Sequence, residues 1–219
     1  MQIKELHIET NNLSTTCLFY QDRLGLPVVF RSKEQLSFNI GSSLLYFHLN
    51  ENSHAQYHIA FNIPCNLIKE AYEWLSGKAA PIVLDNGSAI VDFRNWNAES
   101  VYFLDNNGNI LECIARKDLG NGRDKQFDHT DLLAISEVGV VTENVKATCD
   151  SLISKFGMTY FDKQPPLKNF SALGDDEGLL IISSSGRNWY PTEIPSKAFP
   201  VKVCMDIHQK LYMLSSNDL

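Results

Sequence analysis

The amino-acid sequence predicts an α+β protein built from tandem βαβββ units. Its main support is an internal repeat, in which the order strand, helix, glycine recurs three times at nearly constant spacing. The spacing is 20 residues from Glu5 to Gly25, 19 from His58 to Gly77 and 20 from Glu137 to Gly157. The second observation is a β-hairpin over residues 101–116, whose turn has the sequence DNNGN. Because one βαβββ unit leaves an apolar sheet face uncovered, at least two units must combine around a core.

The elements follow the same order in each unit. In the first unit, an alternating strand over residues 4–10 precedes a helix over 13–24, with Asn12 as its N-cap and Gly25 after its end. Short strands are expected at 28–31, 36–40 and 44–49. The second unit has a strand at 56–62, a helix from Pro64 to Ser76, and strands at 82–84, 89–93, 101–104 and 110–115. The third has a strand at 132–142, a helix at 144–155, and strands near 158–162, 170–173 and 179–183.

Composition excludes several classes of partner. The formal net charge is -7 and no run of Lys or Arg occurs, so neither nucleic acid nor an anionic membrane is expected to bind. No apolar stretch approaches the roughly 18 residues of a transmembrane helix. The five cysteines are widely spaced and form no CxxC motif, which favours reduced thiols in a cytoplasmic protein over a disulfide framework.

Glu112 is the most informative single residue in the hairpin. In a strand over residues 110–115 it shares one face with Ile110 and Ile114, among strongly apolar neighbours. A carboxylate is costly to bury there without a compensating group. The face therefore either lines a wet cavity or gives Glu112 a cationic partner, such as Arg94, Arg31 or a metal ion.

Three segments carry a family resemblance: FYQDRLGL at 19–26, HIAFNIP at 58–64 and LDNNGNILECIAR at 104–116. They resemble the vicinal oxygen chelate superfamily, which includes glyoxalase I, bleomycin-resistance proteins and type I extradiol dioxygenases. The resemblance implies that paired βαβββ modules curl their sheets into a cup. It divides the chain into a two-module cup at 1–118, a linker at 119–130, and a third module with a partial fourth at 131–219. The third module lacks its full partner and so has an exposed seam, which is expected to pack against the first cup or against a second chain; a homodimer is therefore expected.

The resemblance also implies a divalent metal site. Transferred by position, the ligands are Glu5 and His58 from first strands and Glu112 from a last strand. The ion would be Zn, Ni, Mn or Fe, and its occupancy stays open. Tyr46 stands at the last-strand position of the first module. Glu137 repeats the first-strand position in the third module, but residues 179–183 offer no matching carboxylate, so that third site is expected to be empty.

Two functions are compatible with these residues. The first is a metal-dependent enzyme of the glyoxalase or dioxygenase type, which chelates adjacent oxygens of a small substrate. His7 and Tyr46 would then be catalytic proton carriers, and His48 would contact substrate. Iron oxygenases prefer two histidines and one carboxylate, so Glu5 weakens the dioxygenase interpretation. The alternative is a metal-free protein of the bleomycin-resistance type that sequesters an aromatic or cationic small molecule.

Overall fold

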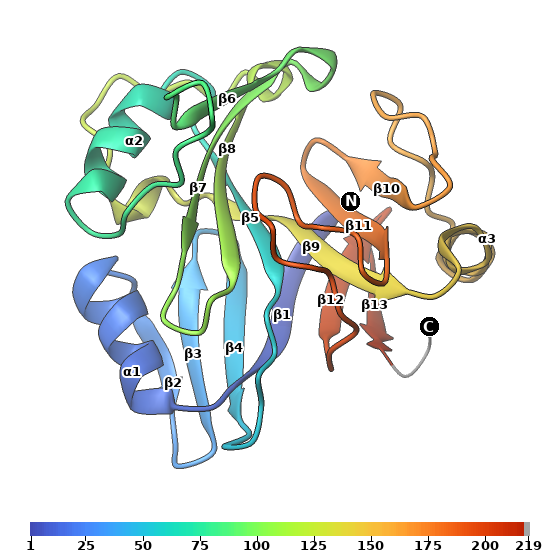
Figure 1. The fold of residues 1–219 in the computed structure, drawn as a ribbon, viewed down its shortest axis with the longest axis horizontal. Helices are drawn as coiled ribbons and strands as arrows, with labels where there is room; N and C mark the ends of the chain where they lie inside the picture. Colours follow the sequence, from blue (N-terminus) through green and yellow to red (C-terminus); the bar gives the residue numbers. More distant parts are fainter. Residues whose placement is uncertain (217–219) are drawn as a thin grey trace.

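The computed structural model describes residues 1–216 and shows two curled β-sheets with helices against their outer faces (Figure 1). The six-stranded sheet has the order β13-β12-β1-β4-β3-β2. Its strands are β1 (Gln2–Thr10), β2 (Val28–Arg31), β3 (Gln35–Ile40), β4 (Ser43–Leu49), β12 (Lys202–Ile207) and β13 (Lys210–Ser215). The predicted α+β class is therefore confirmed.

The seven-stranded sheet has the order β10-β11-β9-β5-β8-β7-β6. Its strands are β5 (His58–Ile63), β6 (Ile90–Phe93), β7 (Ala98–Leu104), β8 (Ile110–Arg116), β9 (Ala134–Thr142), β10 (Phe170–Asp175) and β11 (Gly178–Ser184). The expected strands at 82–84 and 158–162 are reduced to isolated bridges, Pro81 to Phe103 and Tyr160 to Leu173.

Three helices follow the first strands of the repeat. They are α1 (Leu13–Cys17), which continues as a π-helical turn over Leu18–Arg23, α2 (Ile68–Ser76) and α3 (Val145–Phe156). The side chain of Asn12 accepts hydrogen bonds from the backbone N–H groups of Ser14 and Thr15, and Asn144 caps α3 in the same way. None of the helices in the described part of the chain has the length and apolar character needed to cross a membrane.

The sheets group the modules differently from the prediction. The first strand of the second module, β5, pairs antiparallel with β9 of the third module, whereas β1 pairs antiparallel with β12 of the truncated fourth. Residues 1–118 therefore do not form one shared cup. Each first strand is bonded on one side to the last strand of its own module and needs a partner on the other side. The third module finds that partner within the chain, in β5 of the second module. The homodimer stays a prediction.

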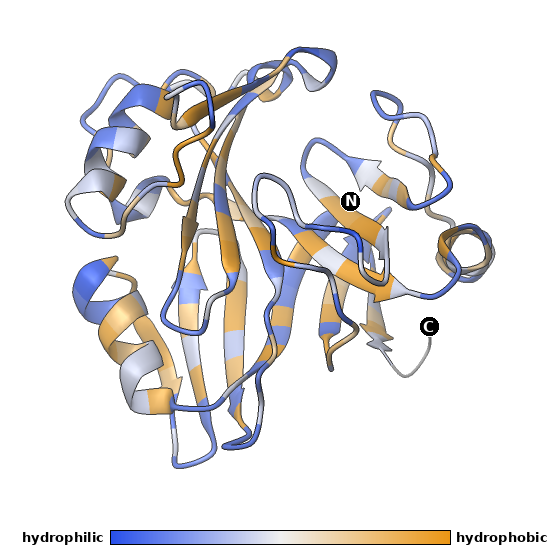
Figure 2. Ribbon diagram, in the orientation of Figure 1, coloured by the Kyte–Doolittle hydropathy of each residue, from blue (hydrophilic) through white to orange (hydrophobic). Residues whose placement is uncertain are grey.

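One cluster of buried hydrophobic residues spans both sheets and the helices that pack on them. It combines Leu6 and Phe47 from the six-stranded sheet with Ile59 and Phe61 from the seven-stranded sheet. Hydrophobic residues run along the strands of both sheets, while hydrophilic residues predominate in the loops (Figure 2). Gly41 fits where the sheets meet, because a Cβ at this position would lie 1.9 Å from the carbonyl oxygen of Leu133. These core residues lie on one face of the seven-stranded sheet. The candidate site lies on the opposite, concave face.

The hairpin turn before β8 is fixed by the buried carboxylate of Asp105. One of its oxygens accepts hydrogen bonds from the backbone N–H groups of Asn107, at 2.8 Å, and Asn109, at 2.9 Å. The other accepts from the Asn109 side chain and from the Tyr20 hydroxyl, both at 2.7 Å. Tyr20 thereby ties the first module to the turn that sets the register of Glu112.

The Tyr20→Phe variant is expected to lower the free energy of unfolding by about 1.5–3 kcal/mol, because it removes one buried hydrogen bond to a carboxylate. Urea denaturation measures the change. Tyr72→Phe on the exposed side of α2 is the matched control and is expected to have almost no effect. Equal stabilities of the Tyr20→Phe variant and the parent protein would contradict a stabilising role for the hydrogen bond between Tyr20 and Asp105.

Candidate metal centre

Three side chains converge on the concave face of the seven-stranded sheet: His58 from β5, Glu112 from β8 and Glu137 from β9. The strand register explains the convergence, because Ala60 pairs with Glu112 on one side and with Glu137 on the other. His58 lies two residues before Ala60 and so points to the same face. The small side chain of Ala60 leaves the space above it to the three larger ones.

The geometry of this cluster suits a metal ion. The Nε2 atom of His58 lies 3.7 Å from Oε2 of Glu112 and 3.6 Å from Oε2 of Glu137. One ligand atom from each residue falls within 4.8 Å of the other two. An ion with bonds of about 2.0–2.2 Å holds neighbouring ligand atoms about 3.0–3.5 Å apart, so a small inward movement completes the site. One imidazole and two carboxylates suit a hard or borderline divalent ion.

Each carboxylate accepts a hydrogen bond at one oxygen, Oε1, while its other oxygen faces His58. The Ser100 hydroxyl donates to Oε1 of Glu112 at 2.5 Å. Arg116 donates to Oε1 of Glu137, and its other terminal nitrogen lies 3.4 Å from Asp176. The Arg116 side chain is fully buried, above the rings of Trp96 and Phe161. Such outer contacts orient ligands in metal sites.

The three groups alter one another's protonation. Burial and the charge of Glu137 raise the pKa of Glu112 to about 7. Burial by itself would lower the pKa of His58, but the two carboxylates outweigh it and raise the pKa. Burial by itself would raise the pKa of Glu137, yet His58 and Arg116 lower it. Near neutral pH the cluster therefore holds protons that a divalent ion would displace.

The cluster forms one wall of a cavity of about 290 Å³ with largely aromatic sides. Trp189, from the loop after β11, stacks on His58 with ring centroids 5.3 Å apart. Gly139 makes room for it, because a Cβ there would lie 2.7 Å from the Trp189 ring. The position on β11 that corresponds to Glu112 is occupied by Ile181, which pairs with Gly139. The described residues thus offer three candidate ligands beside the cavity.

Comparison with solved structures identifies this architecture. A candidate dioxygenase from Bacillus subtilis superposes with a TM-score of 0.59 at 16% identity, over 84% of this chain. Glyoxalase I from Zea mays superposes with a TM-score of 0.53 at 14% identity, over 89% of this chain and 70% of its own. The chain has the vicinal oxygen chelate fold. It spans 63% of the length of the Bacillus subtilis protein. Neither a protein-family model nor a curated protein matches the sequence.

Within the vicinal oxygen chelate fold, the structure brings together two of the three predicted ligands, His58 and Glu112. Glu5 lies in the other sheet, where its Oε2 atom is 3.3 Å from Nε2 of His7. Its place beside His58 is taken by Glu137, which the sequence analysis left in an empty third site. The reason is the module pairing: β9, not β1, is the antiparallel neighbour of β5.

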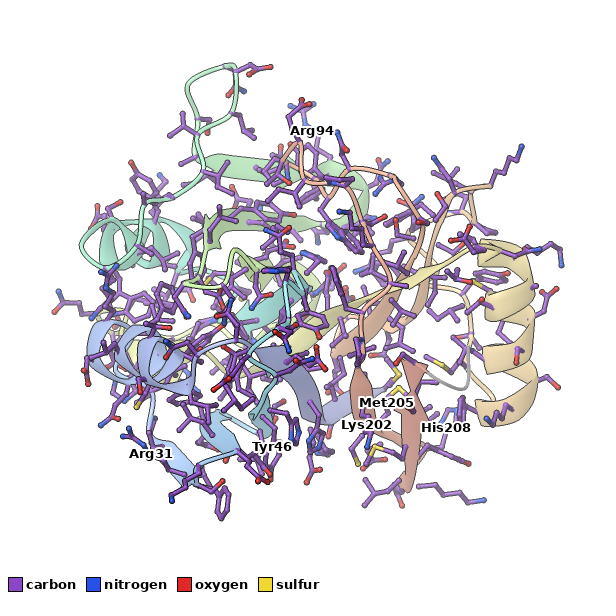
Figure 3. The ribbon with its side chains drawn as sticks, turned by 60° about the horizontal axis from the view of Figure 1, so that its bottom comes forward. Arg31, Tyr46, Arg94, Lys202, Met205 and His208 are labelled. Atoms are coloured by element: carbon purple, nitrogen blue, oxygen red, sulfur yellow. The ribbon has the colours of Figure 1, made fainter. Side chains whose placement is uncertain are left out.

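The predicted catalytic and substrate-binding residues gather on the six-stranded sheet. Tyr46 stacks on His7 at 4.3 Å between ring centroids, and Nδ1 of His7 lies 3.0 Å from Nε2 of His48. Figure 3 shows Tyr46 at the lower part of the molecule, far from Arg94 at the upper rim. In the six-stranded sheet, His7 pairs with Lys202. At the corresponding position of the seven-stranded sheet, Ala60 pairs with Glu137. The six-stranded sheet therefore has a cation where the seven-stranded sheet has a carboxylate. His7, Tyr46 and His48 therefore lie on a different sheet from the ligands.

The sequence analysis also missed the residues that complete the site. Neither arginine considered for Glu112 contacts it: Arg94 pairs with Asp92, and Arg31 donates to the Cys17 sulfur. The cation that binds a carboxylate of the cluster is Arg116, which binds Glu137. The sequence could have indicated Arg116, because it lies four residues after Glu112 in the same strand and therefore on the same face.

Proposed function

We propose that this protein is a metal-dependent enzyme that binds a small substrate through two adjacent oxygens, with His58, Glu112 and Glu137 as the metal ligands. The convergence of three buried ligand atoms, beside a cavity that can admit a substrate, is the observation that supports it. A single imidazole with two carboxylates departs from the two-histidine set of iron oxygenases. Proton transfer next to a carbonyl, as in glyoxalase chemistry, is therefore favoured over ring cleavage.

When bound, the ion would act as a Lewis acid toward the substrate oxygens. Tyr102, on the cavity wall, is the residue placed to assist. Burial and the nearby carboxylates Glu112 and Glu137 raise its pKa well above the usual range, so its hydroxyl stays protonated. A protonated hydroxyl can donate a hydrogen bond to an oxygen that becomes negative during the reaction. Tyr102 thus takes the place in this proposal that His7 and Tyr46 had in the sequence analysis.

A metal-free binding protein is the second candidate, and the charges of the cluster favour it. Protonated His58 and Arg116 balance the two carboxylates of Glu112 and Glu137 without an ion. The aromatic walls would bind a flat ligand equally well with or without metal. The two functions differ in one measurable property, the stoichiometric uptake of a divalent ion.

The test is the metal content of the full chain after separate incubation with Mn²⁺, Co²⁺, Ni²⁺, Zn²⁺ or anaerobic Fe²⁺ and removal of free ion. We expect about one ion per chain for at least one of these metals, and a visible absorption band for a Co²⁺ complex. His58→Ala is expected to remove the ion. His7→Ala, which deletes a half-buried histidine on the other sheet, is the control and is expected to retain it.

Two results would contradict the enzyme proposal. One is the absence of stoichiometric metal in the parent protein, which favours the binding protein. The other is loss of the ion in His7→Ala but not in His58→Ala, which would place the site on the six-stranded sheet. Circular dichroism of each variant establishes that the fold is intact.

A further inference from the structure

Arg187 contributes a second polar feature to the cavity that holds the candidate metal site. It lies in the loop after β11, with its guanidinium 4.7 Å from the centre of the Phe170 ring on β10. Its guanidinium donates a long hydrogen bond, 3.4 Å, to the backbone oxygen of the neighbouring Asn188. Within residues 1–216, no acidic side chain forms an ion pair with it. The half-buried guanidinium therefore has donors to spare.

The other charged groups of this cavity are paired. His58 faces Glu112 and Glu137, and Glu137 is also bonded to Arg116. Burial lowers the pKa of Arg187 from its ordinary value, which shows that water does not fully solvate the charge. A partly desolvated guanidinium without a carboxylate is stabilised when a ligand supplies an anion.

Aromatic rings flank the space between Arg187 and the metal ligands. Tyr190 contacts Phe93 and Tyr102 edge to face, with ring centroids 5.9 Å apart in both pairs. Trp189 covers His58, and Trp96 lines the same cavity. Such walls favour a planar ligand over an aliphatic one. A volume of about 290 Å³ is at the small end of ligand cavities, which fits a molecule of one or two rings.

We propose that the cavity selects a small planar aromatic anion, whose carboxylate or equivalent oxyanion is bound by Arg187. Its ring lies among the aromatic side chains, and its opposite end faces His58, Glu112 and Glu137. This inference rests on the proposed function for the adjacent oxygens at that opposite end, but the anion contact is independent of any metal. Arg187 is thus a specificity-determining residue.

The test compares 3,4-dihydroxybenzoate with 3,4-dihydroxybenzamide, which share a ring and two hydroxyls and differ in the anionic group. Isothermal titration calorimetry at pH 7 measures both with the full chain, metal-free and zinc-loaded. We expect the acid to bind at least about tenfold more tightly than the amide in both states, the usual size of a charge-assisted hydrogen bond. Arg187→Met should reduce this ratio to near one, and Arg187→Lys should keep part of it.

Arg94→Met is the matched control, because Arg94 is highly exposed and pairs with Asp92 outside the cavity. It should preserve the preference for the acid. The inference is overturned if the parent protein binds acid and amide equally, if Arg187→Met keeps the preference, or if neither compound binds at millimolar concentration. Failure of the proposed function has a different signature: zinc leaves the affinity for both compounds unchanged, while the metal-free protein still prefers the acid.

Discussion

Replacement of Arg116 by methionine is expected to lower the free energy of unfolding by about 3–5 kcal/mol at pH 7, the usual cost of breaking a buried ion pair. The side chain is fully buried and bonded to Glu137 and Asp176. Methionine fills much of the volume above Trp96 and Phe161, so the loss comes from charge. Glu137 would keep its negative charge beside Glu112 with only His58 to compensate it. Urea denaturation of the metal-free protein measures the effect.

The double variant Arg116→Met with Glu137→Gln separates charge from packing. Neutralising Glu137 removes the uncompensated buried carboxylate, so the double variant should be more stable than Arg116→Met alone, by about 1–3 kcal/mol. If the two variants have the same stability, the loss in Arg116→Met is due to packing and the ion pair contributes little. Lys163 is expected to compensate Asp176 in both variants, because its ammonium group also contacts that carboxylate.

Local features of the fold could be predicted because each has a local physical cause. Asn12 begins a helix because its side chain accepts from backbone N–H groups that have no helical partner. Gly157 ends α3 with φ +68°, a conformation that costs other residues energy. Glu112 could be predicted as a candidate site residue because a carboxylate among apolar strand residues requires a partner. These arguments use only residues near one another in the sequence.

The pairing of modules could not be predicted in the same way. The first strands β1, β5 and β9 have similar patterns, and backbone hydrogen bonds between strands do not depend on side-chain identity. Contacts between residues far apart in the sequence decide which two first strands pair. One example is the close approach of Gly41 to Leu133, and another is the Ser43 hydroxyl, which bridges Ile3 and Ile135. The assignment of Glu5 in place of Glu137 follows from this one undetermined pairing.

Protonation of the candidate metal centre should make metal binding strongly dependent on pH. An ion requires deprotonated Glu112 and neutral His58. The pKa of Glu112 is raised to about 7, and that of His58 is raised above its ordinary value of 6.5. Protons therefore compete with the ion at both ligands. Between pH 7.5 and pH 6, the affinity for Zn²⁺ should fall by about thirtyfold or more, the product of the two proton competitions. Calorimetric titration in buffers of different ionisation enthalpy measures the protons released.

The stability of the metal-free protein should change in the opposite direction. The pKa of Glu112 is 4.5 in the unfolded chain and about 7 in the folded protein. Between these pH values the folded state binds more protons than the unfolded chain, so the free energy of unfolding falls as pH rises through this interval. His58 has a raised folded pKa, so its contribution is present below about pH 6.5 and is lost above it. The pKa of Glu137 is lowered, so its contribution to stability changes only below pH 4.5, the pKa in the unfolded chain. The melting temperature of metal-free protein should therefore fall from pH 5.5 to pH 8, while the increment produced by Zn²⁺ should grow. A Zn²⁺ increment that is the same at both pH values would mean that the ion does not displace these protons, and hence that it binds elsewhere.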